Sequence, residues 1–113
     1  MTAEGVQFRW MGQQAVVTLP AEIDAVNAST VRQALLAGAR HDAAVLIIDM
    51  SRTTFCDSAG LKAIIAAHTQ ATQAGTQLRL VATAVLRIIT IVGIDQLIPV
   101  YPTLEAALTE SPG

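Results

Sequence analysis

An apolar run followed closely by a helical pattern, within residues 45–65, constrains the fold of this chain more than any other feature. The run Val45–Ile48 is aliphatic and mostly β-branched, which predicts a strand buried on both faces. After a polar link, side chains recur with the i, i+3, i+4, i+7 spacing of one helix face: Leu61, Ile64, Ile65 and His68. The stretch therefore predicts a buried strand joined by a short link to an amphipathic helix.

Strand and helix patterns alternate along the remaining sequence. We expect strands at residues 7–10, 15–19, 45–49 and 77–81, a short extended piece at 98–101, and helices at about 27–38, 58–74, 85–92 and from 103 onward. Gly12 lies in the link between the first two strands and indicates a hairpin. The order β-β-α-β-α-β-α-β-α predicts an α/β fold with a mixed, mostly parallel central sheet, an N-terminal antiparallel hairpin and about four helices.

Three local patterns refine this expectation. Residues 77–81 (QLRLV) alternate polar and apolar side chains, which predicts a strand with one less buried face. Pro99 keeps the extended piece at 98–101 out of a central position in the sheet. Pro20 ends the second strand, and residues 22–24 (EID) then form a short acidic link. The strand at 45–49 is therefore expected at the centre of the sheet.

Composition limits the classes of function that the chain can have. With 113 residues, 52% of them hydrophobic and 14% charged, we expect one folded domain spanning residues 1–113. Neither a bilayer-spanning apolar run nor the basic start of a signal peptide is recognisable. The single cysteine fits a reducing compartment. The net charge is −2 and the seven basic residues are scattered, so the sequence shows no basic patch that could bind nucleic acid. We expect a cytoplasmic monomer that binds neither nucleic acid nor membrane.

The common arrangements of an active site are missing from the sequence. Ser58 and His68 lie ten positions apart on one predicted helix, about 15 Å at 1.5 Å per residue, so they cannot form a nucleophilic pair. His41 precedes the central strand and lies at the opposite end of the sheet from the helix start. No zinc-ligand spacing, phosphate-binding loop or dinucleotide fingerprint occurs, so no metal or other cofactor is expected.

A cluster of three aspartates offers an alternative, a site for a metal ion. Asp24, Asp49 and Asp57 could gather at the carboxyl ends of the strands, where a magnesium ion could bind their oxygen atoms. A nucleotide-binding protein or small enzyme would use such a pocket. No phosphate cradle or general base accompanies these three residues, so the sequence favours a binding domain without catalytic activity.

The remaining candidate is Ser58, at the predicted start of the helix at 58–74. Asp57 and Ser58 are both good N-cap residues, so a purely structural role for Ser58 is one interpretation. The other is phosphoryl acceptance, because unsatisfied N–H groups and the positive helix end favour an anion there. A phosphate would add −1.5 to −2 charges beside Asp57 and Asp24 and could switch partner binding without reshaping the domain.

The sequence around Ser58 resembles the STAS domain family, in its branch of anti-sigma factor antagonists. Residues 49–51 (DMS) and 55–61 (FCDSAGL) match the central family motif, and residues 22–24 with Asn27 resemble its acidic motif. Further matching segments are 75–81, 85–94 and 101–108. The resemblance extends over residues 6–108, and it favours the phosphoryl-acceptor interpretation because the whole motif agrees.

The resemblance implies a function and a set of partners. The unphosphorylated domain would bind an anti-sigma factor serine kinase of the GHKL type and so release the sigma factor that the kinase holds. The kinase would then phosphorylate Ser58 and end the binding, and a PPM-type phosphatase would reverse this. Asp24 and Asp57 would flank Ser58, and Ala59, Gly60 and Lys62 would complete the docking surface.

Several alternatives accompany this expectation. A STAS domain could instead serve in a stressosome-like or lipid-transport ATPase assembly. Lys62 stands where the family commonly has small or polar residues, and it could pair with a phosphate, pair with an acidic partner or remain solvated. Thr53 and Thr54 are either secondary phosphoryl acceptors or, as we expect, turn residues. Cys56 is expected in the core rather than as a redox switch.

Overall fold

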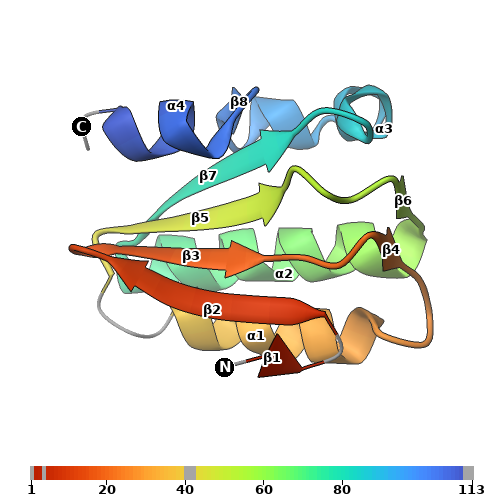
Figure 1. Ribbon diagram of the computed structural model, residues 1–113, viewed down its shortest axis with the longest axis horizontal. Helices are drawn as coiled ribbons and strands as arrows, with labels where there is room; N and C mark the ends of the chain where they lie inside the picture. Colours follow the sequence, from red (N-terminus) through yellow and green to blue (C-terminus); the bar gives the residue numbers. More distant parts are fainter. Residues whose placement is uncertain (1, 4, 40–42, 111–113) are drawn as a thin grey trace.

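The main sheet has six strands in the order β1-β2-β3-β5-β7-β8 (Figure 1). The computed structural model describes residues 2–3, 5–39 and 43–110. The strands are β1 (Thr2–Ala3), β2 (Val6–Met11), β3 (Gln14–Thr18), β5 (Val45–Met50), β7 (Gln77–Ala82) and β8 (Val100–Tyr101). β1, β2 and β3 pair antiparallel, and the pairs β3–β5, β5–β7 and β7–β8 are parallel. This confirms the predicted mixed sheet with an N-terminal hairpin.

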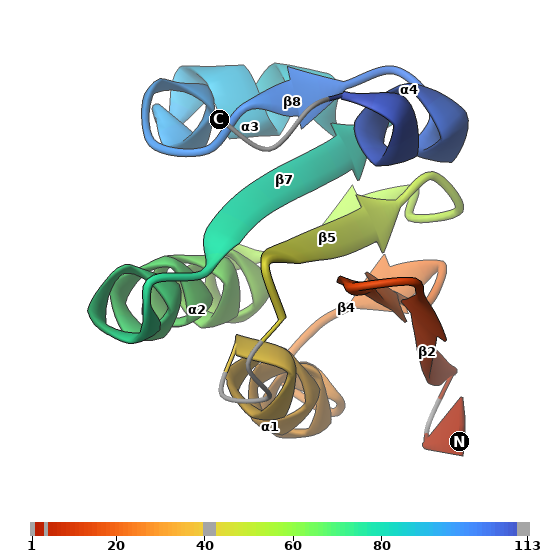
Figure 2. The same cartoon turned by 90° about the vertical axis from the view of Figure 1, so that its left-hand side faces the viewer.

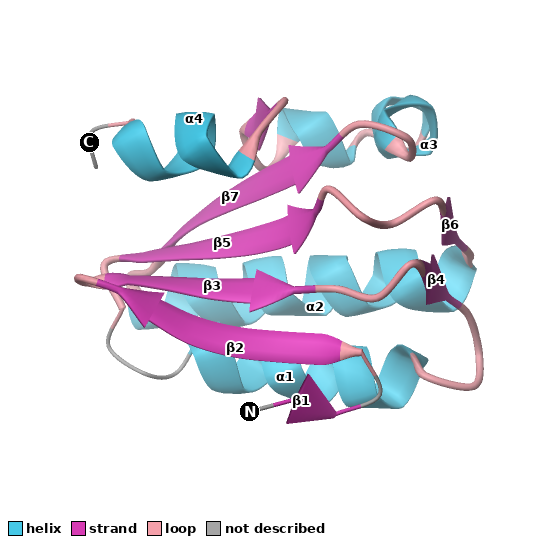
Figure 3. Cartoon of the chain, viewed as in Figure 1, coloured by secondary structure: helices cyan, strands magenta, loops and turns pink. Residues whose placement is uncertain are grey.

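Helices cover both faces of this sheet (Figures 2 and 3). They are α1 (Ala28–Ala39), α2 (Ser58–Ala74), α3 (Leu86–Ile91) and α4 (Leu104–Thr109), with a 3-10 helix, η1 (Ile94–Gln96), after α3. A separate two-stranded ribbon, β4 (Glu22–Ile23) with β6 (Phe55–Cys56), stands at the end of the molecule where α2 begins (Figure 1). His41, predicted to lie at the opposite end of the sheet from the helix start, lies outside the described residues.

The hairpin turn is tighter than expected. Met11 pairs with Gln14, which leaves only Gly12 and Gln13 in the turn. Gly12 has φ 68°, a left-handed conformation that glycine adopts at no steric cost. The predicted four-residue link therefore contains the ends of both strands.

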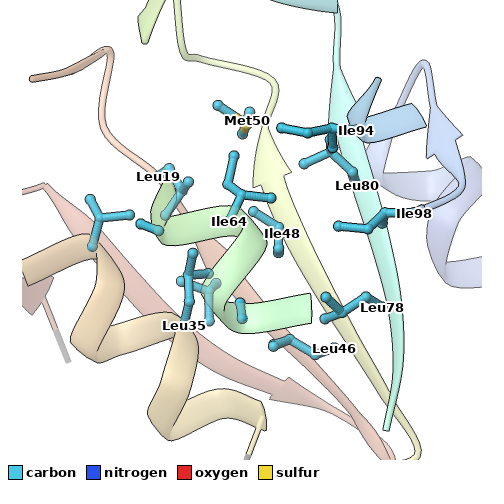
Figure 4. Packing of buried hydrophobic residues seen from close by; sticks show 14 of the residues in the cluster. Leu19, Leu35, Leu46, Ile48, Met50, Ile64, Leu78, Leu80, Ile94 and Ile98 are labelled. Atoms are coloured by element: carbon cyan, nitrogen blue, oxygen red, sulfur yellow. The ribbon is translucent and has the colours of Figure 1, made fainter. Parts of the chain in front are cut away.

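Every side chain of β5 is buried, as its apolar run predicts. Leu46, Ile48 and Met50 face the side covered by α1 and α2, where Figure 4 shows Ile48 and Met50 near Ile64 and Leu46 near Leu78. Val45 and Ile47 face the opposite side, where α4 contributes Ala107. At roughly 1.5–3 kcal/mol for each large buried side chain, this strand stabilises both layers of the fold.

The inward face of α2 differs in part from the prediction. Leu61 and Ile64 are buried as expected, but Ile65 is 43% exposed and wrongly assigned to the core. Ala67 and Ala71 take the inward positions instead, and their small side chains leave α2 close to the sheet and to α1. Gly75 ends the helix with φ 75°, and its N–H donates back to the carbonyl oxygen of Thr72, so the predicted helix end is confirmed.

β7 is buried on both faces, contrary to the expectation of one less buried face. α4 covers the second face, and Arg79 is 1% exposed beneath it. Its Nη1 donates to the carbonyl oxygen of Ala107 at 2.6 Å, and its Nη2 donates to Gln77 Oε1 at 3.0 Å. A guanidinium at a helix C-terminus is favoured by the helix dipole, so Arg79 fastens α4 to the sheet.

The last elements agree more closely with the sequence. β8 is an edge strand beside Pro99, and the Thr103 hydroxyl oxygen caps α4 by accepting from the N–H of Ala106 at 3.0 Å. α3 is shorter than the predicted helix at 85–92, and Val92, just after its end, is 47% exposed. Gly93, with φ 83°, turns the chain from α3 into η1.

Arg79 provides a test of how α4 is held. Arg79→Ala removes both the packed stem and the donor to Ala107, and we expect a loss of about 3 kcal/mol in the free energy of unfolding. Arg79→Met keeps the stem volume and should cost only about 1 kcal/mol, the price of an unpaired carbonyl. Chemical denaturation followed by circular dichroism measures both. An unchanged denaturation midpoint in Arg79→Ala would contradict this role.

Candidate functional site

The β4–β6 ribbon brings two distant motifs together. Its parallel register pairs Glu22 with Phe55 and Ile23 with Cys56. The next residue of each strand is an aspartate, and the N–H of Asp57 donates to the carbonyl oxygen of Ile23 at 3.0 Å. Asp24 and Asp57 therefore leave the ribbon as neighbours. The segment expected as an acidic link is in fact a short strand.

The link between β5 and β6 is anchored to the segment before β4. Thr53 is fully buried, and its hydroxyl donates to the carbonyl oxygen of Pro20 at 2.9 Å. Thr54 is exposed and donates through its hydroxyl to the carbonyl oxygen of Ala21 at 3.3 Å. These bonds give both threonines the structural role expected of them, and burial removes Thr53 from the reach of any kinase.

The loop after β4 is held by Asn27. Its Oδ1 accepts from the N–H of Asp24 at 3.1 Å, and its Nδ2 donates to the carbonyl oxygen of Glu22 at 2.8 Å. Asp24 Oδ1 in turn accepts from the N–H of Val26 at 2.9 Å. The Asn27 side chain thus fixes the acidic motif in the loop that leads into α1.

Asp57 caps α2, and Ser58 follows as the first residue of the helix. Asp57 Oδ1 accepts from the N–H groups of Ala59 at 3.0 Å and Gly60 at 3.2 Å. Ser58 is exposed and takes no part in the capping bonds. The interpretation of Ser58 as the N-cap is therefore wrong, because its neighbour fills that position. The Ser58 hydroxyl is left facing solvent beside a fixed carboxylate.

Gly60 lets the first turn of α2 approach the ribbon closely. A Cβ atom at this position would lie 2.6 Å from Cys56 Sγ and 2.7 Å from Ile23 Cγ2. Real Cβ atoms do not tolerate such distances, so a side chain here would push the helix away from β4 and β6. Gly60 is buried and acts on the site by setting the position of Ser58.

Cys56 is buried on the ribbon, as expected. Burial raises the pKa of its thiol from 9.0 to about 11, and the negative charge of Asp57 adds to this rise. The thiol therefore stays protonated at neutral pH. A protonated, buried thiol is a poor nucleophile, which argues against a redox role.

Two shallow grooves flank this region. One, of about 290 Å³, lies between the ribbon and α3, with the half-exposed Phe55, Arg87 and the exposed Ile91 in its lining. The other, of about 280 Å³, lies between α1 and α2, with Arg32 and Lys62 in its lining. Arg32 was not singled out from the sequence, because its place beside Lys62 in this groove depends on how α1 and α2 pack.

The acidic residues do not form a metal site. Among the residues that the structure describes, no three His, Cys, Asp or Glu side chains gather closely enough to hold a metal ion. Asp24 and Asp57 meet at the ribbon, but Asp49 is buried at the end of β5, where its Oδ1 accepts from the N–H of Ser51 at 3.0 Å. The alternative of a magnesium pocket at the strand ends is therefore not borne out.

Comparison with known proteins identifies the family. The model of the STAS domain matches residues 7–107. The chain belongs to the STAS domain family. A search of curated protein sequences found no match. Across the described chain, this STAS domain has no helix that is both long enough and apolar enough to cross a membrane.

Solved structures resemble this STAS domain over nearly its whole length. An anti-sigma factor antagonist from Mycobacterium paratuberculosis has 31% identity and a TM-score of 0.81, with 96% of this chain and 97% of that chain covered. The anti-sigma factor antagonist SpoIIAA in its unphosphorylated form has 18% identity and a TM-score of 0.74, covering 91% and 92%. The phosphorylated form, from Bacillus, has 17% identity and a TM-score of 0.70, covering 91% and 96%.

Gly60 supplies the first test of the site. In Gly60→Ala the new methyl group meets the ribbon, and we expect a loss of about 1–3 kcal/mol in the free energy of unfolding. Gly38→Ala in α1 is the comparison, because its Cβ would lie 3.0 Å from Leu46 Cδ1 and 3.3 Å from Phe8 Cε2, farther than the contacts at Gly60. Urea denaturation measures both variants. Equal stability of the two would show that the close approach of α2 is unimportant.

The pKa of Cys56 supplies a second test. At pH 8 a thiol with a pKa of about 11 has roughly 100-fold less thiolate than one at 9.0. We therefore expect iodoacetamide to label the folded protein about 100-fold more slowly than the urea-unfolded protein at the same pH. Mass spectrometry of timed samples measures both rates. Comparable rates would mean that the thiol is exposed and ionised in the fold.

Proposed function

We propose that this STAS domain is an anti-sigma factor antagonist whose binding is switched by phosphorylation of Ser58. The observation that carries the proposal is the exposed Ser58 hydroxyl at the start of α2, free of the cap that Asp57 provides. The similarity to solved anti-sigma factor antagonists supports the general role. The solved phosphorylated and unphosphorylated forms of SpoIIAA support the regulatory step.

The unphosphorylated domain binds an anti-sigma factor serine kinase of the GHKL type and releases the sigma factor that the kinase holds. Asp24, Asp57, Ser58, Ala59 and Lys62 form the docking surface, and the buried Gly60 contributes to it by positioning the first turn of α2. The kinase transfers the γ-phosphoryl group of ATP to Ser58 Oγ, so that an O–P bond forms, the hydroxyl proton leaves and ADP is released. A PPM-type phosphatase hydrolyses that bond and restores the binding form.

The switch acts through charge rather than through a change of fold. A phosphate adds −1.5 to −2 charges at an exposed position, beside the carboxylates of Asp24 and Asp57. The positive end of α2 offsets this charge locally, so the domain stays folded. Acidic or apolar groups of the partner opposite Ser58 are then repelled by several kcal/mol. The domain itself contributes binding only, and the catalytic groups belong to the kinase and phosphatase.

Variants of Ser58 test this function. We expect Ser58→Ala to stay folded and to retain the partner permanently, because it has no hydroxyl to phosphorylate. Ser58→Asp should weaken the partner's binding about 10- to 100-fold, since it places one negative charge at the centre of the docking surface. Thr69→Asp adds the same charge further along α2 and serves as the control. Pull-downs from host lysate read by mass spectrometry identify the partner, and titration of the purified partner measures Kd.

The outcomes separate the proposed function from its alternatives. A GHKL kinase retained by Ser58→Ala and by Thr69→Asp, but lost with Ser58→Asp, supports the switch. Transporter or stressosome components retained by both Ser58 variants would replace the proposal with a role in such an assembly. An unfolded Ser58→Ala variant would mean that Ser58 is chiefly structural.

A further inference from the structure

A small hollow between the first turns of α1 and α2 lies beside the proposed phosphorylation site. It has a volume of about 280 Å³ and is lined by Ala28, Ser29, Arg32, Ala59, Lys62 and Ala63. The two helices run side by side and begin at the same end of the molecule (Figure 1). Small side chains form most of the lining, and two long cationic side chains accompany them.

The hollow adjoins Ser58 through α2. Lys62 follows Ser58 by four residues, one helical turn, so both side chains lie on the same face of the helix. Ala59, the direct neighbour of Ser58, lines the hollow itself. Arg32 reaches the same place from α1. Arg32 and Lys62, which are 30 positions apart in sequence, thus lie on one surface beside the proposed phosphorylation site.

The charge of the hollow is not neutralised within the described part of the protein. Arg32 and Lys62 are exposed, and neither forms an ion pair with a described carboxylate. The carboxylate of Asp57 is engaged in capping α2, and that of Asp24 accepts from the N–H of Val26. The N-terminal ends of both helices add positive partial charge. An anionic group from another molecule fits this site.

We infer that Arg32 and Lys62 hold an aspartate or glutamate side chain of the anti-sigma factor partner. This inference rests on the proposed function. A guanidinium can form two parallel hydrogen bonds with a carboxylate, a bidentate pair. The small alanine side chains of the lining leave room for a carboxylate to approach. Asp24 and Asp57, on the ribbon side of Ser58, attract cationic groups of the partner. The partner therefore places an acidic group opposite Arg32 and Lys62 and a basic group opposite Asp24 and Asp57. This arrangement of charges determines how the partner is oriented on the surface.

The spacing of Ser58 and Lys62 on α2 gives phosphorylation of Ser58 a second effect on partner binding. A phosphoserine at position 58 lies at the i, i+4 spacing from Lys62, where opposite charges attract each other on a helix. The phosphate draws the ammonium group of Lys62 away from the partner's carboxylate. Phosphorylation of Ser58 thus adds negative charge to the docking surface and also removes one of its two cations from the partner.

Charge reversal at the hollow tests the inference. The probe is the purified partner retained by Ser58→Ala, and the measured quantity is its Kd for Arg32→Glu and Lys62→Glu variants by calorimetry. We expect each reversal to weaken binding at least 10-fold, and Arg32→Gln and Lys62→Gln to fall between the reversals and the unsubstituted protein. Arg9→Glu, at an exposed position of β2, makes the same change in net charge and should alter Kd less than twofold. Unchanged thermal midpoints establish that all variants are folded.

The result that overturns the inference is distinguishable from failure of the proposed function. If Arg32→Glu and Lys62→Glu match Arg9→Glu while Ser58→Asp weakens binding, the carboxylate site is wrong and the switch stands. Slower phosphorylation of Lys62→Glu with an unchanged Kd would assign the cations to the phosphates of ATP and also overturn it. If the reversals weaken binding but Ser58→Asp does not, the hollow is a docking site and the proposed switch is wrong.

Discussion

The close approach of the first turn of α2 to the β4–β6 ribbon is the constraint on which the site depends. Gly60 allows it, because any Cβ would collide with Cys56 and Ile23. The Asp57 cap then fixes the helix start, and the ribbon register places Asp24 beside Asp57. A displacement of this turn would also move the Ser58 hydroxyl relative to both aspartates. Backbone packing, rather than a network of side chains around Ser58, determines where the serine is presented.

The packed core around β5 holds the elements that carry the site in place. β5 is buried on both faces, so α1 and α2 on one side and α4 on the other pack on the same strand. Arg79 fastens α4 by donating to the carbonyl oxygen of Ala107. Such a core resists small displacements because interiors are close-packed. We therefore expect a negative charge added at Ser58 to change which groups the surface attracts while the fold stays the same.

Much of the architecture was predictable because local patterns and tertiary packing agree. The VLII run, the caps at Gly75 and Thr103 and the edge position beside Pro99 each depend on chemistry within a few residues. Errors occurred where a distant element decided burial. Ile65 has core-like spacing but faces solvent, and β7 alternates in sequence yet is covered by α4. Neither periodicity nor composition indicates which helix will lie on which strand.

The sequence by itself determined the kind of fold, the family and the choice of Ser58 as the candidate phosphorylation site, because strand burial, helix spacing and the DSAGL motif are local properties. Only the tertiary structure decided that Asp57 rather than Ser58 caps α2, since both residues suit that position and the backbone geometry selects one. It also decided that Asp24 lies next to Asp57 at the end of the ribbon and that Arg32 and Lys62 line the same hollow. These pairs join segments about 30 residues apart, and such contacts arise from strand register and helix packing, which no local pattern encodes.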